Sequence, residues 1–89
     1  MQIDLGKFGD LLISRPAGRE AALVVRAYFK PQHAQEPIEL DFTAVLVLAP
    51  SWLDEFLQGL RTYCENPVRC LPSTNPTVIA SLKTLQLGP

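Results

Sequence analysis

Apolar residues recur with a helical period from Ser51 onward. The spacing i, i+1, i+4, i+5, i+8 places them along one stripe of a helix, and polar residues occupy the other face. Asn66 and Pro67 end the pattern, since proline cannot continue a helix. The sequence therefore predicts an amphipathic helix over residues 51–65. Its apolar stripe comprises Trp52, Leu53, Phe56, Leu57, Leu60, Tyr63 and Cys64.

Start signals mark two further helices. Ser14 and Pro16 open an amphipathic pattern that continues to Tyr28 or Phe29. The Ser14 hydroxyl can accept a hydrogen bond from a free N–H of the first turn, and Pro16 gives up no needed donor there. An Asn-Pro pair at residues 75–76 repeats the signal. It predicts a last helix whose buried stripe contains Val78, Ile79, Leu82 and Leu85.

Two segments alternate apolar and polar residues in the manner of β-strands. They are QIDL (residues 2–5) and IELDF (residues 38–42). Each is expected to have one buried face and one face near solvent. TAVLVLAP (residues 43–50) is apolar almost throughout, which fits either an extension of the strand or a buried connector. VRCLP (residues 68–72) predicts a short third strand.

The order of these elements predicts the fold class. Strands and helices alternate with short links, which is typical of an α/β sandwich whose central strands are parallel and joined by right-handed crossovers. Gly6 and Gly9 bracket a turn before the segment DLLIS (residues 10–14), and this pattern also fits a hairpin with an antiparallel edge strand. We expect one α/β domain over residues 1–89, with a mixed, mostly parallel sheet of three to four strands and three helices.

Composition narrows the classes of function. The chain has 89 residues, of which 47% are hydrophobic, and its 8 Lys and Arg nearly balance its 9 Asp and Glu. A domain of this size can bury one core, and its charge gives no basic footprint for nucleic acid, so no nucleic-acid partner is expected. The N-terminal segment lacks the pattern of a secretion signal, and no apolar run has the length of a bilayer span. The sequence therefore predicts a cytoplasmic protein without a membrane partner.

The reactive residue types do not form a recognisable catalytic set. Cys64 and Cys70 have five residues between them and are expected to be buried free thiols that behave as small hydrophobes. With the single His33 they do not complete the four-ligand set of structural zinc. No carboxylate and serine accompany His33 at a recognisable spacing, and no Gly-rich loop follows a strand. We expect neither enzymatic activity nor a cofactor or metal.

Ser51 is the residue for which a structural and a functional interpretation compete. In the structural one, SWLDE is a capping box, in which the Ser51 hydroxyl accepts from the N–H of Asp54 and the Asp54 carboxylate reaches back to Ser51. In the functional one, Ser51 is a phosphorylation site at a helix N-terminus, whose free N–H groups favour an anion while Asp54 and Glu55 oppose it.

Two neighbouring features leave a similar choice. Trp52 is either a core anchor or the centre of a partner interface, where tryptophan is a frequent hot spot. In the segment SRPAGRE, Ser14 is either a helix cap beside the solvated charges of Arg15 and Arg19, or part of a site in which the two arginines hold a phosphate or a partner carboxylate.

Four segments resemble, in order and spacing, the STAS-like domains of unknown function. They are FGDLLISRPAG (Phe8 to Gly18), LDFTAV (Leu40 to Val45), SWLDE (Ser51 to Glu55) and NPTV (Asn75 to Val78). That family is similar to anti-sigma factor antagonists. The resemblance implies a small, non-catalytic STAS-like β/α domain that binds a partner protein. It also makes Ser51 the nearest counterpart of the serine that a histidine-kinase-like ATPase phosphorylates in the antagonists, where the phosphate breaks the partner complex.

The resulting hypothesis is a regulatory interaction module with a protein partner such as a histidine-kinase-like ATPase. One alternative is a self-associating structural subunit, a homodimer that pairs through an exposed sheet edge or a patch around the tryptophan. A second alternative, suggested by family analogy alone, is a small-ligand sensor. The expected interface uses the start of the helix after the central strand. Its candidate residues are Pro50, Trp52, Asp54, Glu55, Ser14 and Arg15.

Overall fold

The computed structural model describes residues 1–87 and confirms the predicted α/β class, with three helices and short strands between them. A short 3-10 helix, η1, follows the first strand. The elements in chain order are β1 (Gln2–Asp4), η1 (Leu5–Phe8), β2 (Leu11–Leu12), α1 (Arg15–Tyr28), β3 (Ile38–Asp41), β4 (Val47–Leu48), α2 (Pro50–Tyr63), β5 (Val68–Cys70) and α3 (Pro76–Thr84).

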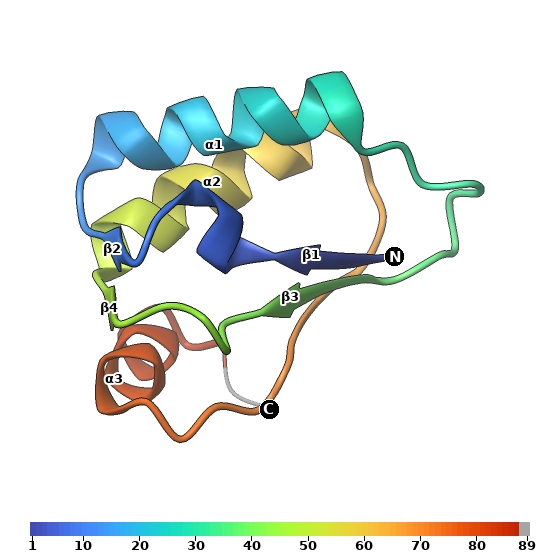
Figure 1. The fold of residues 1–89 in the computed structure, drawn as a ribbon. Coiled ribbons are helices and arrows are strands. Elements are labelled where there is room, and N and C mark those ends of the chain that lie inside the picture. The colour runs from blue at the N-terminus through green and yellow to red at the C-terminus, as the bar shows by residue number, and fades with distance from the viewer. Residues whose placement is uncertain (88–89) are drawn as a thin grey trace.

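The strands form two small parallel sheets (Figure 1). One has the order β1-β3-β5, and the other pairs β2 with β4. The first two strand–helix units are built alike: β1 and β2 precede α1, and β3 and β4 precede α2. The predicted hairpin and its antiparallel edge are wrong, since β1 and β2 pair with β3 and β4 and not with each other. Between them Asp4 caps η1 by accepting from the N–H of Gly6, which turns the chain without reversing it.

Helices α1 and α2 lie side by side over one face of the larger sheet (Figure 1). Two glycines allow this close packing. A Cβ at position 18 would collide with the carbonyl oxygen of Trp52, and one at position 59 would collide with the Cβ of Ala22. The predicted start of α1 is confirmed, because the Ser14 hydroxyl accepts from the N–H of Ala17 at 3.2 Å.

The core lies between this helix pair and the strands. Trp52 and Phe56 of α2 stack with ring centroids 5.0 Å apart, and Phe8 packs against both rings. The inward residues of the strands complete the core, as the alternation of QIDL and IELDF predicts. The most deeply buried apolar residues include Ile3, Leu5, Leu12, Ile38, Leu40, Leu53 and Leu60.

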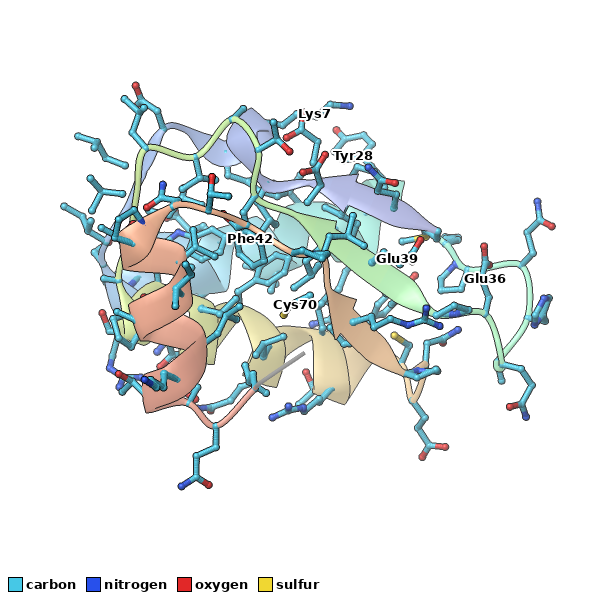
Figure 2. The ribbon with its side chains drawn as sticks, turned by 90° about the horizontal axis from the view of Figure 1, so that it is seen from below. Lys7, Tyr28, Glu36, Glu39, Phe42 and Cys70 are labelled. Atoms are coloured by element: carbon cyan, nitrogen blue, oxygen red, sulfur yellow. The ribbon has the colours of Figure 1, made fainter. Side chains whose placement is uncertain are left out.

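The opposite face of the larger sheet is polar and open (Figure 2). Glu39 and Asp41 of β3 alternate with the buried Ile38 and Leu40, which confirms the prediction of one face near solvent. Gln2, Asp4 and Arg69 lie on the same face, because Gln2 and Arg69 are in register with Glu39, and Asp4 is in register with Asp41.

Helix α3 covers the free side of β4 and does not lie over the open face of the larger sheet. Its start is the predicted one, since the Asn75 side chain accepts from the N–H of Thr77. Two hydroxyls on successive turns of α3 then bond to the backbone of Leu48 on the side of β4 that faces away from β2. The Thr77 hydroxyl accepts from the N–H of Leu48, and the buried Ser81 hydroxyl donates to the C=O of Leu48 at 2.9 Å. No helix within residues 1–87 combines the length and the hydrophobicity of a membrane span.

Candidate functional site

The candidate site lies where β2 and β4 end and α1 and α2 begin. Because these strands are paired in parallel and these helices pack together, the two strand–helix turns lie next to each other (Figure 1). Ligands of open α/β sheets bind outside the carboxyl ends of the strands, which is the position of these turns. The fold thus brings the predicted segments SRPAGRE and SWLDE together.

Ser51 is not the cap of α2, and the predicted capping box is wrong. The helix begins at Pro50, with Ala49 in the cap position and no side chain of residues 1–87 capping that end. Proline suits the first helical position because its ring fixes φ and its missing N–H is not needed there. Ser51 is therefore one residue inside the helix. Its half-buried hydroxyl donates to the C=O of Ile13 at 3.1 Å and so links the two turns.

Asp54 bonds to α1 and does not reach back to Ser51. Its carboxylate accepts from Nη1 of Arg15 at 3.0 Å and from Nε2 of Gln58 at 3.1 Å. The hydrogen bond from Arg15, followed by that from Gln58, holds the pKa of Asp54 below its ordinary value. Asp54 is consequently a carboxylate at neutral pH, and it joins the starts of the two helices.

A second carboxylate completes this cluster of charges. Glu55 lies 3.6 Å from Nη1 of Arg15 and 3.8 Å from Nε of Arg19. Two arginines of α1 therefore face two acids of α2, with the arginine side chains exposed and the acid side chains less so. Arg15 and Arg19 are not only solvated charges, and an incoming anion would have to compete with Asp54 and Glu55 for them.

Trp52 is the one interface candidate that the structure rules out. Its side chain is 1% exposed and packs against Phe8 and Phe56, so the prediction of a partner contact through Trp52 is wrong and the core interpretation is confirmed. Trp52 belongs to the apolar face of α2, which packs toward the sheet. The other candidates keep accessible surface on the outside of the turns. Ser14 and Arg15 are exposed, and Pro50, Ser51, Asp54 and Glu55 are half-buried.

The sequence did not indicate an exposed apolar surface beside these turns, which we call the β2–β4 patch. It consists of Leu11, Ile13, Leu46 and Val47, whose exposed fractions lie between 37% and 64%. Leu11 and Val47 are direct register partners, while Leu12 between Leu11 and Ile13 is buried. Period-two alternation was the available signal, but it is hidden because the inward residues Leu12 and Leu48 are apolar as well.

The thiols and acids of the described chain do not assemble into a metal site. No group of three or more His, Cys, Asp or Glu within residues 1–87 could hold an ion. Cys64 and Cys70 are free thiols, as predicted, but they are half-buried where burial was expected. Burial raises the pKa of Cys70, which keeps it as a thiol at neutral pH.

Comparison of this chain with protein-family models, curated proteins and solved structures finds no match. The resemblance to STAS-like domains therefore stays a prediction from four short segments. The geometry of the two turns and of the β2–β4 patch is what supports a function.

Proposed function

We propose that this chain is a non-catalytic regulatory module that binds a partner protein through the β2–β4 patch and the turn containing Ser51. The observation that carries the proposal is the exposure of four large apolar side chains in β2 and β4 or next to them in the chain, of which Leu11 and Val47 are direct register partners. Contiguous exposed apolar surface on a small domain marks an interaction site, since covering it with a partner removes apolar area from water.

The rim of the patch has the polar groups that such an interface needs. Ile13 belongs to the patch, and its C=O is bonded to the hydroxyl of Ser51. The Arg15–Asp54 pair lies just beyond, with Arg15 largely exposed. An apolar centre with a hydrogen-bonding rim is the usual anatomy of a protein interface. The STAS-like resemblance suggests a histidine-kinase-like ATPase as the partner.

The position of Ser51 also suggests how binding would be regulated. A phosphorylated Ser51 has no hydroxyl proton to donate to the C=O of Ile13, and it adds about −1.5 to −2 charges beside that oxygen. Asp54 and Glu55 add further negative charge one turn along α2. Repulsion would therefore displace the turn that carries Ile13, a patch residue, and weaken the complex.

The proposal is tested by mixing the purified chain with histidine-kinase-like ATPases from the same genome and measuring the complex by sedimentation velocity. The wild-type chain should bind. Leu46→Asp, which places a charge in the patch at an exposed position, should weaken binding at least about tenfold. Leu23→Asp is the matched control, because Leu23 is similarly exposed on α1 outside the patch, and it should bind as the wild type does.

Two variants of Ser51 test regulation by phosphorylation separately from binding through the β2–β4 patch. Ser51→Asp should weaken the complex and Ser51→Ala should preserve it, while mass spectrometry after incubation with ATP should place a phosphate on Ser51. A complex that ignores both Leu46→Asp and Ser51→Asp would overturn the proposal. A concentration-dependent homodimer that Leu46→Asp dissociates would replace it with self-association through the same patch.

A further inference from the structure

Strand β5 is an edge strand. It pairs with β3 on one side, and no other strand of the described chain pairs with its outer side. The N–H of Ile38 bonds to the C=O of Pro67, and the N–H of Leu71 bonds to the C=O of Leu40, so alternate residues of β5 face β3. The backbone groups of Val68 and Cys70 consequently point outward, in the arrangement that accepts an added strand.

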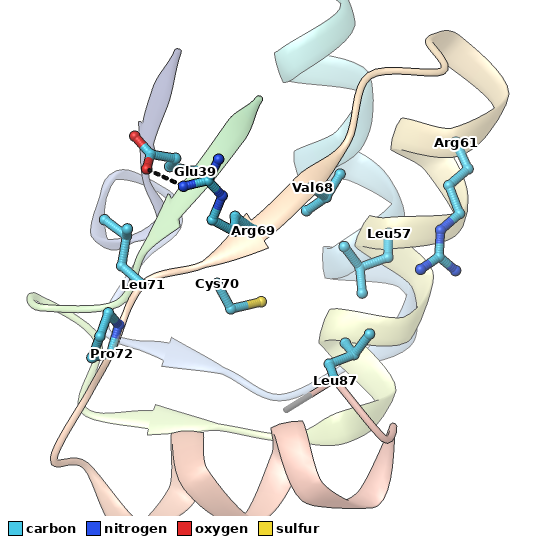
Figure 3. A pocket seen from close by; sticks show the side chains of 9 residues that line it. All are labelled: Glu39, Leu57, Arg61, Val68, Arg69, Cys70, Leu71, Pro72 and Leu87. Carbon is cyan, nitrogen blue, oxygen red and sulfur yellow. Dashed lines mark ion pairs between the residues drawn. The ribbon is translucent and has the colours of Figure 1, made fainter. Parts of the chain in front are cut away.

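A groove runs along this outer edge (Figure 3). It has a cavity volume of about 440 Å³ and lies between β5, the second half of α2 and the residue Leu87 after α3. Its apolar floor is formed by Leu57 of α2, which is only 3% exposed, and by the half-buried Leu87, and the Cys70 thiol points toward both.

Positive charge lies on both sides of the groove. Arg61 projects from α2 on the helix side, and Arg69 lies on the open polar face with its Nη1 3.8 Å from Glu39 (Figure 3). Arg69 is well exposed, so its guanidinium can meet a second carboxylate on its outer side. The groove thus combines an apolar floor, a free strand edge, and two cations, one of which, Arg69, also faces the lining residue Glu39.

The inner neighbour of β5 already shows which sequence suits this strand. In β3, Ile38 is in register with Val68, Glu39 with Arg69, and Leu40 with Cys70. An apolar–acidic–apolar triplet places two side chains toward the helices and one carboxylate beside Arg69.

We propose that the outer edge of β5 binds an extended segment of a partner protein with the pattern apolar–acidic–apolar. The segment would add a fourth strand to the larger sheet, with main-chain bonds to Val68 and Cys70, an acidic side chain beside Arg69, and apolar side chains against Leu57 and Leu87. This surface is separate from the β2–β4 patch, so the proposal does not depend on the function proposed above.

A second copy of the chain is a poorer occupant. In an antiparallel β5–β5 pair centred on the middle residue, Arg69 would lie directly opposite the Arg69 of the other copy. Like charges in that position are destabilising, whereas an acidic residue there is favourable. Charge complementarity therefore selects a partner segment.

The test uses short labelled peptides and fluorescence anisotropy with the full chain. A peptide with the central sequence Ile-Glu-Leu should bind, and its Ile-Lys-Leu counterpart should bind at least about fivefold more weakly. The Ile-Glu-Leu peptide with N-methylated backbone amides should not bind, because it cannot form the strand ladder. In Arg69→Glu, checked for folding by circular dichroism, the preference between the two charged peptides should reverse.

Backbone amide exchange locates the peptide. Binding should slow the exchange of the Val68 and Cys70 N–H groups and leave that of Leu11, on β2, unchanged. No binding, equal binding of the Glu and Lys peptides, equal binding of the N-methylated peptide, or protection elsewhere than β5 would each overturn the proposal. A homodimer in solution that protects the same two amides would overturn it in favour of a second copy.

Discussion

Two glycines determine how closely α1 and α2 approach. Gly18 lies against the backbone carbonyl of Trp52, which cannot move aside as a flexible side chain would. Gly18→Ala should therefore destabilise the fold by about 1–3 kcal/mol, the usual range for overpacking, although alanine is the better helix former. Urea denaturation monitored by Trp52 fluorescence measures this change. A variant as stable as the wild type would show that the helices do not pack this closely.

Gly59 provides the matched control for this prediction, because its obstacle is a side chain. A Cβ at position 59 would meet the Cβ of Ala22. Gly59→Ala should be destabilising alone and partly rescued by Ala22→Gly, which removes the opposing atom, whereas no single side-chain change can rescue Gly18→Ala. A double-mutant cycle over positions 22 and 59 reports the coupling.

At the scale of elements, α3 is held to β4 by side-chain hydroxyls. Ser81 is buried and donates to the C=O of Leu48, so Ser81→Ala leaves a buried acceptor without its donor. We expect a loss of about 1–3 kcal/mol in the free energy of unfolding. Thr84→Ala is the control: the Thr84 hydroxyl is exposed and bonds within α3, so its loss should change stability by less than about 0.5 kcal/mol. Equal effects in the two variants would contradict this role of Ser81.

Local signals predicted the elements better than their ends and partners. The side chains of Ser14 and Asn75 cap α1 and α3 as expected, because capping depends on residues next to each other in the chain. The same reasoning failed at α2, where Pro50 takes the first helical position and moves Ser51 inside the helix. The Arg15–Asp54 pair spans 39 residues, and its members meet because β2 pairs in parallel with β4 and α1 packs against α2.

The apolar segment TAVLVLAP shows why the candidate site was only partly predictable. Its composition fitted a buried connector, yet Leu46 and Val47 are exposed while Val45 and Leu48 are buried. Which side chains face solvent depends on the neighbouring element, and here α3 and β2 leave one side of β4 open. The β2–β4 patch thus follows from topology, which the pattern of residues did not reveal.

At the scale of the whole molecule, three carboxylates link folding to pH. Hydrogen bonds to native partners hold the pKa of each below its ordinary value. For Glu36 the main donor is the N–H of Gln32, followed by the N-terminal ammonium, and for Asp41 it is the hydroxyl and then the N–H of Thr43. For Asp54 the main donor is Arg15. The three carboxylates therefore lie in the loop before β3, at the end of β3 and between α1 and α2.

A lowered pKa in the folded state sets the sign of the effect. The folded form binds protons less readily than the unfolded form, so the stabilisation is complete above the unfolded carboxyl pKa of about 4 and is lost as the pH falls through the lower folded values. Thermal unfolding midpoints should therefore be flat from neutral pH to about pH 5 and decline below it. The unfolding midpoint of Asp54→Asn should decline less steeply with falling pH than that of the wild type. Added salt should weaken the stabilisation from the Arg15–Asp54 contact more than that from the Thr43–Asp41 hydrogen bonds, because the Thr43 donors carry no charge. A midpoint that rises on acidification, or an Asp54→Asn profile as steep as that of the wild type, would show that the Arg15–Asp54 contact does not favour the folded state.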